Sequence, residues 1–432
     1  MPGGSWSRLF TRAAALVFYK SVQPDAGDTS TGGEKLTADL FTRQAKAAIE
    51  TLNDEWYNVQ TGIWDDAWWN SGNAFTTLAD FAILRPEAAN EINVGGYLRN
   101  TYVQAQTVQV QTTKNIDALG KVSSFSSIAG GQGDSPINGP GLDRHVGKNT
   151  WDKRQFAQFR NDFYDDMGWW ALGLIRAFDV TGDRSYLDSA IIIFDDFATG
   201  LGGPCKGGVY WSRDRKYVNA ITNELYLSIA ASLANRIPSE PRYLTTARGQ
   251  WDWFKNSGMI NSENLINDGL DDQCKNNGMQ TWSYNQGVIL GGLVELHRAN
   301  RKVNPPSSSS DDSSLLEQAK AIARAAIKHL SNPDGILVET DKCELRSGNC
   351  GKDGQQFKGI FVRNLRYLHD ESPEEEFRRF ILDQAVSVWE NDREKGVGKF
   401  KLGVAWAGPF VKATGASQSC ALDALVAAIA VV

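Results

Sequence analysis

Apolar residues recur at intervals of three and four along most of the chain, the spacing that places side chains on one face of a helix. Met167, Trp170, Leu174 and Phe178 form one such stripe, which a Thr-Gly-Asp turn follows. The next segment carries a second stripe, so the two predict an αα-hairpin. The whole pattern predicts about twelve helices in six pairs, at 38–57, 68–83, 91–109, 161–179, 184–199, 218–236, 240–257, 283–300, 313–330, 355–369, 373–392 and 416–431.

Strand-like stretches are few, and Gly207 to Trp211 and Ile336 to Glu339 are expected to form small hairpins in loops. Val110 to Asn149 is the main irregular insertion, and a loop of that length is either functional or mobile. Asn304 to Ser314 is a loop between helices, because the helical periodicity resumes after it. Six helical hairpins without a strong break predict an all-α closed ring with an inner and an outer layer.

The expected domain organisation is a flexible leader or weak signal segment over 1–35, followed by a single domain over 36–432. Arg8 and Arg12 precede the apolar run Ala13 to Tyr19, but this run is short for a signal core and lacks a small-residue cleavage site. Ala424 to Val432 is too short to span a membrane and is better explained as a terminal core helix.

Charge and aromatic content narrow the function. The net charge of −6 and the lack of clustered Lys and Arg argue against a nucleic-acid groove. Separately, we expect the chain to be a monomer. The 14 tryptophans often stand beside Asp, Asn or Gly. A Trp ring has a flat apolar face and a polar edge, so it suits either a core or a platform for sugar C–H groups.

The five cysteines do not show the spacing of a metal site, since they include no CxxC pair and no nearby His. Cys343 and Cys350 bracket a short loop and are expected to form a local disulfide. Cys205 and Cys274 lie in inter-helix loops and are able to pair, which would leave Cys420 free. Disulfides indicate an oxidising compartment, so the chain is expected to be secreted.

Two of the adjacent aspartate pairs precede a Trp pair: Asp65 with Asp66, and Asp165 with Asp166. The second pair opens a predicted helix, where a carboxylate often caps the backbone N–H groups. One Asp suffices for a cap. A second Asp beside aromatic residues would have its pKa separated from that of the first, which suits a glycosidase that needs one ionised and one protonated carboxylate. Spacing alone leaves capping and catalysis both open.

A longer resemblance separates these alternatives. The stretch FYDDMGWWALGLIRAFDVTGDRSYLDSA resembles the signature of glycoside hydrolase family 76, the α-1,6-mannanases of bacteria and fungi. The resemblance covers roughly 36–430 and continues in order through GGVYWS at Gly207, NAITNELYLSIAASLA at Asn219, TWSYNQGVILGGLVEL at Thr281, FKGIFVRNL at Phe357, and the pieces GPF at Gly408 and ALDAL at Ala421.

The resemblance implies an (α/α)6 barrel as one catalytic domain over 36–432 and retaining, endo-acting cleavage of α-1,6-mannosidic linkages in mannan. It implies that Asp165 is the nucleophile and Asp166 the general acid/base, with no metal or organic cofactor. It also makes a cell-wall location possible beside a secreted one.

Further residues are expected to bind substrate, each with a structural alternative such as capping, burial or ion pairing. The resemblance places Trp68, Trp69 and Asn70 on the first inner helix and Tyr210 and Trp211 on an aromatic platform. For Asp65 and Asp66, capping of the helix at 68–83 is favoured for one of the two. The other candidates are Tyr164, Trp169, Asn223, Glu224, Ser283, Tyr284, Asn285, Gln286, Lys358 and Arg363.

Three alternative functions remain. A fungal branch of the family is thought to transfer mannan from lipid-anchored proteins to wall glucan, but the run YDDMGWW is closer to the hydrolytic branch. A non-catalytic mannan-binding protein would be expected to lose one carboxylate of the pair. An inverting glycosidase would need carboxylates spaced widely enough to admit water.

Overall fold

A computed structural model describes residues 35–108, 110–116, 122–128, 158–303, 310–345 and 350–432, so almost all of the expected leader lies outside the described residues. The described helices are α1 (Ala38–Trp56), α2 (Trp68–Leu84), α3 (Pro86–Glu91), α4 (Val94–Ala105), α5 (Tyr164–Thr181), α6 (Arg184–Phe197), α7 (Ala220–Arg236), α8 (Pro241–Asn256), α9 (Ser283–Val303), α10 (Ser310–His329), α11 (Phe357–Glu371), α12 (Glu375–Asn391) and α13 (Gly415–Val431).

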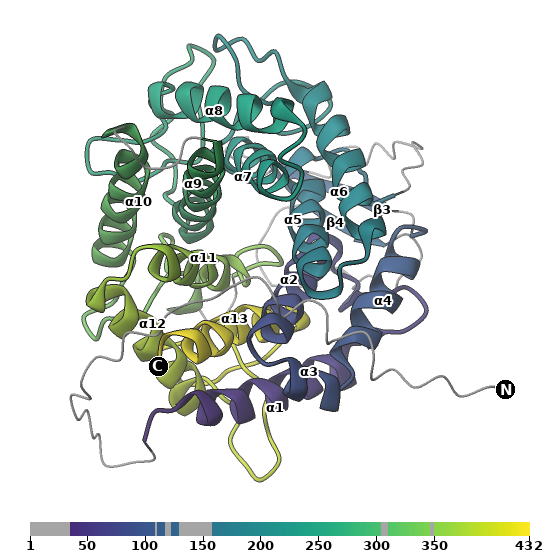
Figure 1. The fold of residues 1–432 in the computed structure, drawn as a ribbon. Helices are drawn as coiled ribbons and strands as arrows, with labels where there is room; N and C mark the ends of the chain where they lie inside the picture. Colours follow the sequence, from purple (N-terminus) through teal and green to yellow (C-terminus); the bar gives the residue numbers. More distant parts are fainter. Residues whose placement is uncertain (1–34, 109, 117–121, 129–157, 304–309, 346–349) are drawn as a thin grey trace, which may run out of the picture.

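Six of these helices form a closed inner ring. The contacts run from α2 to α5, α7, α9, α11 and α13, and α13 returns to α2 (Figure 1). The outer helices α1, α6, α8, α10 and α12 pack on the outside of this ring. The ring confirms the predicted all-α architecture of two helical layers, an (α/α)6 barrel.

Burial explains which helices are inner. α7 and α13 bury residues around nearly their whole circumference, as expected of helices covered on every side. α8 and α12 bury only one face. Because outer helices return the chain between successive inner helices, the inner helices all point the same way. We call the end at their first turns the front end and the end at their last turns the rear end.

The main departures from the predicted elements lie between α2 and α5. The helix predicted over 91–109 is wrong in its bounds, because α4 spans only Val94–Ala105 and begins after Asn93, whose φ of 55° is left-handed. The short helix α3, which ends at Glu91, was not predicted. The insertion predicted as irregular contains an antiparallel hairpin of β3 (Val110–Ile116) and β4 (Val122–Ile128). The rest of that insertion up to Asn149 lies outside the described residues.

Smaller elements follow the prediction more closely. Bridges Leu201↔Val209 and Ser331↔Leu337 confirm the two small loop hairpins. A further hairpin, β1 (Tyr57–Asn58) with β2 (Ile63–Trp64), was not predicted. The predicted loop Asn304 to Ser314 is too long, since α10 already begins at Ser310.

The predicted cysteine pairing is confirmed: Cys205 bonds Cys274, Cys343 bonds Cys350, and Cys420 is free and buried. Both disulfides staple loops, a usage typical of oxidising compartments. The C-terminal apolar run belongs to α13 and is core, as predicted. None of the helices within the described ranges is long and apolar enough to cross a membrane.

Candidate active site

The aspartate pair lies at the front end, in the first turn of α5. Asn161, just before the helix, ties the pair to the helix start. Its side-chain oxygen accepts from the backbone N–H of Phe163 at 3.0 Å, and its Nδ2 donates to Oδ2 of Asp166 at 2.7 Å. This turn, in which an Asn side chain bonds the backbone two residues on, fixes one carboxylate before the helix begins.

Asp165 has a different surrounding. Trp211 Nε1 donates to Oδ2 of Asp165 at 3.0 Å, while Oδ1 is buried without a hydrogen-bond partner among the described residues. The Trp211 ring packs on Phe163 with 4.7 Å between centroids. Burial, and then the charge of Asp166, raise the pKa of Asp165 well above its usual value, and the Trp211 hydrogen bond opposes them in part.

The capping alternative is supported only in part. The N-cap of α5 is Phe163, whose side chain makes no cap hydrogen bond. Backbone N–H groups at Asp165 and Asp166 do favour the charged form of Asp165, but more weakly than burial and Asp166 oppose it. The charged form of a carboxylate placed mainly to stabilise the helix start would not be disfavoured in this way, so capping does not account for Asp165.

A line of aromatic rings crosses the front end beside the pair. The Trp69 and Trp169 rings lie 5.7 Å apart, and Trp169 stacks on Tyr284 at 6.2 Å. Tyr284 stacks face to face on Phe357 at 3.9 Å, and Trp282 meets the edge of Phe357. These rings come from α2, α5, α9, α11 and the residue before α9, so the closed ring of helices assembles them from distant parts of the sequence.

Further acidic side chains surround this line. Asp353 accepts a hydrogen bond from Trp69 Nε1 at 2.9 Å, and burial raises its pKa to about 6. Asp268 accepts from the Tyr217 hydroxyl. Burial, followed by the charges of Asp268 and Asp165, raises the pKa of the Tyr284 hydroxyl well above its usual value. Several carboxyl groups therefore converge on one aromatic ring.

Three predicted substrate-binding residues bond to other parts of the protein, and their role in binding stays a prediction. Asn223 bonds both backbone groups of Val209 and a glutamine of α8. Gln286 bonds both backbone groups of Ile266. Lys358 is fully buried in an ion pair with Glu344 at 2.7 Å. Their polar atoms satisfy buried backbone groups and a buried charge, which would be costly to leave unpaired.

Three other predicted substrate-binding residues pack against parts of the protein away from the front aromatic line. Tyr164 packs outward against Gly200 and shares a hydrogen bond with Thr199. Trp68 is buried against Trp170 at 5.8 Å. Arg363 is buried between α2 and α13, where it pairs with Asp423 and donates to Asn73. The structure does not bring these side chains to the front aromatic line.

The remaining predictions have mixed outcomes. Asn70 donates to a buried glutamine before α11, while its own Oδ1 has no partner in the described ranges. Tyr210 is half-buried beside Trp211. Asp65 accepts a hydrogen bond from the backbone N–H of Gly415, the first residue of α13, whose N-cap is Thr414. Capping of α2 by one of the two aspartates stays a prediction. Asp66 is half-buried with a φ of 50°, and its role in binding stays a prediction.

Sequence reasoning missed Asn161, Asp268, Asp353 and Phe357. An Asn two residues before the N-cap of a helix is a recognisable turn signal, so Asn161 was within reach of the sequence. Asp353 and Phe357 lie far from the pair in the sequence and approach it only because α11 closes the ring next to α9. No local pattern marks them.

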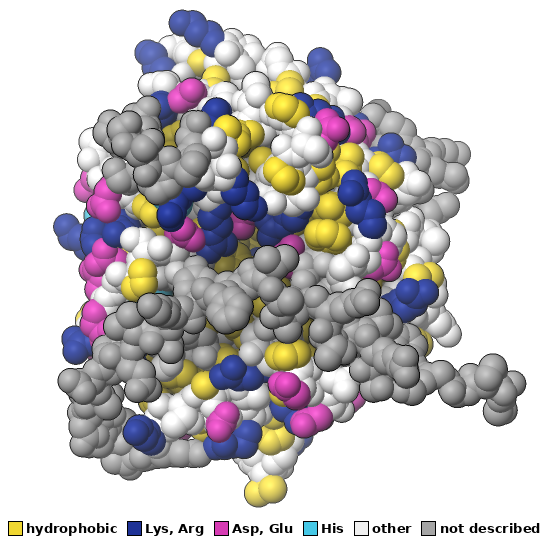
Figure 2. Space-filling model, viewed as in Figure 1, with side chains coloured by type: hydrophobic (Ala, Val, Ile, Leu, Met, Phe, Trp, Pro, Cys, Tyr) yellow, Lys and Arg dark blue, Asp and Glu magenta, His cyan; other side chains and the backbone are white. Residues whose placement is uncertain are grey.

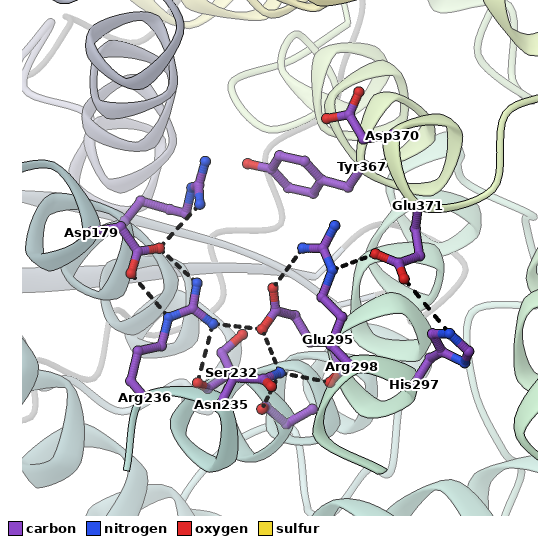
Figure 3. A network of polar contacts seen from close by, with 12 residues as sticks. Asp179, Ser232, Asn235, Arg236, Glu295, His297, Arg298, Tyr367, Asp370 and Glu371 are labelled. Atoms are coloured by element: carbon purple, nitrogen blue, oxygen red, sulfur yellow. Dashed lines mark hydrogen bonds and ion pairs between the residues drawn. The ribbon is translucent and has the colours of Figure 1, made fainter. Parts of the chain in front are cut away.

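The rear end contrasts with the front. A hollow of about 580 Å³ is lined by Asp179, Asn235, Arg236, Glu295, Arg298, Arg301, Lys302 and Glu371. Figure 3 shows the acidic and basic side chains of this hollow linked to one another. On the face shown in Figure 2, basic side chains gather near α7 and α9. Arg236 pairs with two of these acidic side chains, with Asp179 at 2.6 Å and with Glu295 at 2.5 Å.

A metal at one further cluster is unfavourable. Cys343, Glu344 and Cys350 bring three ligand-type atoms within 4.8 Å of one another. The two cysteines are joined in a disulfide, so they offer no thiolate. Glu344 is already paired with Lys358.

A barrel of six helical hairpins that gathers an adjacent aspartate pair and a line of aromatic rings at one end has the architecture of a carbohydrate-active (α/α)6 protein. The sequence profile of Glycosyl hydrolase family 76 matches residues 141–431. The chain belongs to glycosyl hydrolase family 76.

Individual relatives agree with this assignment. The chain is similar to mannan endo-1,6-alpha-mannosidase DFG5 of Saccharomyces cerevisiae, with 27% identity over 240 residues, 52% of this chain and 49% of that protein. The chain spans about half the length of the curated relatives it matches.

Solved structures share the fold at low identity. Dfg5 from Chaetomium thermophilum, in complex with glucosamine, matches with a TM-score of 0.69 and 18% identity over 92% of each chain. An inactive variant of the alpha-1,6-mannanase of Salegentibacter sp. HEL1_6, in complex with alpha-1,6-mannotetrose, matches with a TM-score of 0.65 and 17% identity, covering 90% of this chain and 98% of that one.

Proposed function

We propose that this chain is a retaining, endo-acting glycosidase that cleaves α-1,6-mannosidic linkages in mannan. The observation that carries the proposal is the adjacent, half-buried carboxyl pair of Asp165 and Asp166 beside the aromatic line at the front end. Aromatic faces suit the C–H surface of a sugar ring, and two carboxyl groups with different surroundings suit acid and nucleophile roles.

In the proposed mechanism Asp165 is the nucleophile. Trp211 holds its Oδ2, so Oδ1 is the oxygen available to attack the anomeric carbon. Attack forms a mannosyl ester on Asp165 and breaks the bond from the anomeric carbon to the leaving oxygen, which takes a proton from Asp166. Water then attacks the same carbon, gives a proton to Asp166 and releases Asp165 as a carboxylate.

The proton of the pair must reside on Asp166 when substrate is cleaved. In the unliganded chain, burial and the Asp166 charge favour a protonated Asp165. Adjacent carboxyl groups titrate as a pair, so binding that brings the glycosidic oxygen to Asp166 moves the proton within the pair. The Trp211 N–H supports this shift because it stabilises the ionised form of Asp165.

Relatives support the same assignment. The inactive alpha-1,6-mannanase variant of Salegentibacter sp. HEL1_6 carries alanine at two consecutive aspartates. This chain likewise carries two consecutive aspartates, in the first turn of α5. The curated relatives are named mannan endo-1,6-alpha-mannosidase, which supports the same linkage as the substrate here.

We further propose that the enzyme works as a monomer outside the cell or at the cell wall. The two disulfides support an oxidising location. The substrate, mannan, would then be met as a polysaccharide outside the cell.

The test is product analysis of the wild-type chain with linear α-1,6-manno-oligosaccharides, followed by mass spectrometry and NMR of the anomeric proton. We expect shorter oligosaccharides that first appear with the α configuration. First-formed β products would contradict the retaining mechanism. Products longer than the substrate would favour the transglycosidase alternative, and tight binding without turnover would favour a mannan-binding protein.

A further inference from the structure

Glu224, in the first turns of α7, has a place in the barrel that differs from those of its sequence neighbours. Asn223 faces α8 and Leu225 packs on Gly168 of α5. Ser228 follows Glu224 by four residues, bonds the Val288 carbonyl of α9, and lines an interior cavity of about 100 Å³. Residues four apart share one face of a helix, so Glu224 points toward the barrel interior on the α9 side.

The side chain of Glu224 has no use in the fold. It is fully buried, and neither of its oxygens has a hydrogen-bond partner in the part of the chain that the structure describes. Burial, and then the charge of Asp268, raise its pKa well above the usual value. A fully buried carboxyl group without a cationic partner favours its neutral form, which has one O–H to donate and a carbonyl oxygen to accept.

Asn285 presents a matching amide from the neighbouring helix α9. It is fully buried, and neither its Oδ1 nor its Nδ2 has a partner among the described residues. Since Ser228 lies level with Val288, one turn toward the front end brings Glu224 level with Asn285. Two facing helices thus each present an unsatisfied polar group at the same height.

This position is linked to the catalytic pair. Burial raises the pKa of the hydroxyl of Tyr284, the residue next to Asn285, and Asp268, Asp165 and Glu224 all lie close enough to raise it further when they are ionised. Buried polar groups without partners are rare in folded proteins, and where several converge beside a reactive group they indicate a ligand that completes them.

We propose that Glu224 and Asn285 form a hydrogen-bonding subsite for hydroxyl groups of the sugar bound beside Asp165. The proposal rests on the glycosidase function proposed above. A sugar hydroxyl both donates and accepts, as do a neutral carboxylic acid and an amide, so each finds a complete partner. Both side chains are covered in the unliganded chain, and they reach the sugar by rotamer changes of the kind common on binding.

The test compares Glu224→Gln with Glu224→Leu. Gln keeps the volume, a donor and an acceptor, whereas Leu removes all polarity. We expect the Kd for α-1,6-mannotetraose, measured by calorimetry in the Asp166→Asn background, to rise at least about tenfold with Leu and to stay within about threefold with Gln. Equal Kd values for the wild-type residue and Leu would overturn the proposal.

A pH series separates ligand contact from a merely structural role. Ionised Glu224 has no proton to donate, so binding by the chain with Glu224 should weaken as pH rises, while binding by Glu224→Gln should not share that part of the change. Asp165, Asp268, Asp353 and Tyr284 face the same region and titrate in both proteins, so the difference between the two curves isolates Glu224. Identical curves would contradict the proposal.

Asp392→Leu is the matched control for loss of a buried acid. Both Asp392 oxygens also lack partners in the described ranges, and burial raises its pKa to about 8, but it lies just after α12. We expect Asp392→Leu to leave the Kd unchanged. If the parent chain neither binds nor cleaves the oligosaccharide, the proposed function fails and this inference with it. Cleavage by the parent together with an unchanged Glu224→Leu overturns the inference alone.

Discussion

The two ends of the barrel treat buried acidic side chains in opposite ways. At the rear end, burial acts to raise the pKa of Asp80, but Arg176 and Arg366 outweigh it and the pKa is lowered. The pKa of Asp179 is lowered in the same way, because the charge of Arg236 outweighs the effect of burial. At the front end, burial raises the pKa of Asp165 and of Asp353, and the charge of Lys352 offsets only part of the rise at Asp353.

This comparison indicates that nearby cations, rather than the depth of burial, decide whether a buried carboxyl group is ionised. A paired acid stabilises the fold in its ionised form, because its cation repays the loss of water. An unpaired acid costs stability and holds a proton near neutral pH, which is the property that acid–base chemistry needs. The rear end therefore closes the barrel, and the front end carries the proposed reaction.

The largest expected effect is loss of activity when either aspartate of the front-end pair is replaced. Asp165→Asn and Asp166→Asn should each lower kcat on α-1,6-mannan by at least roughly 1,000-fold, because each removes a group that forms or breaks a bond. Asp165→Asn should not lower the free energy of unfolding, since burial already disfavours the ionised form of this carboxyl group. Initial rates and chemical denaturation check this. A variant that keeps one tenth of the activity would place the chemistry elsewhere.

The second prediction concerns removal of a charge from the ion-pair network at the rear end. Arg236→Met should lower the free energy of unfolding by about 3–5 kcal/mol, because Asp179 and Glu295 lose their shared cation in a buried setting. The folded variant should keep its kcat.

Arg242→Met is the matched control, since Arg242 and Asp195 form an exposed pair on the outer helices. Its expected cost is about 0–1 kcal/mol in urea unfolding. Equal losses for the two variants would contradict the view that the rear network acts through burial.

The third prediction sharpens the comparison through pH. The folded chain keeps the Asp353 proton up to about pH 6, whereas the ordinary value for Asp is 3.8. The folded state thus binds more protons between these values, and stability falls as pH rises across them. Asp353→Asn should stabilise the chain by about 2 kcal/mol at pH 7.5, and the gain should vanish near pH 4.

Asp179→Asn should do the reverse. The folded pKa of Asp179 is lowered below 3.8, so its contribution is present at neutral pH and is lost as pH falls through that lowered value. Urea unfolding at a series of pH values checks both variants. Curves of the same sign for the two would contradict the comparison.

The smallest expected effect concerns the Trp211 hydrogen bond. Trp211→Phe keeps a ring on Phe163 but removes the N–H that stabilises ionised Asp165. The pKa of Asp165 should rise further, so the acidic limb of kcat/KM should move to higher pH by under about one unit, with a loss of a few-fold at neutral pH. An unchanged pH–rate profile would show that this hydrogen bond does not tune the pair.

Much of this fold is predictable from the sequence, because helical periodicity is local and strong. The αα-hairpin around Trp170 and the two disulfides follow from spacing, and the Asp165 and Asp166 pair from its context. The hydrogen-bond and ion-pair partners of the site residues are less predictable, because they lie far away in the sequence. Lys358 was expected to orient substrate, but Glu344 and Val404 hold it, and no pattern around Lys358 announces them. Asp353 reaches Trp69 only through closure of the ring.

The most direct test of the central claim is to trap the covalent intermediate. An α-1,6-mannobiosyl fluoride with a fluorine on the reacting ring would slow hydrolysis of the ester and allow it to accumulate. Mass spectrometry of the intact chain and of its peptides should then show one added glycosyl group on Asp165. A label on another residue, or turnover with inversion and no adduct, would contradict the assignment of the front pair.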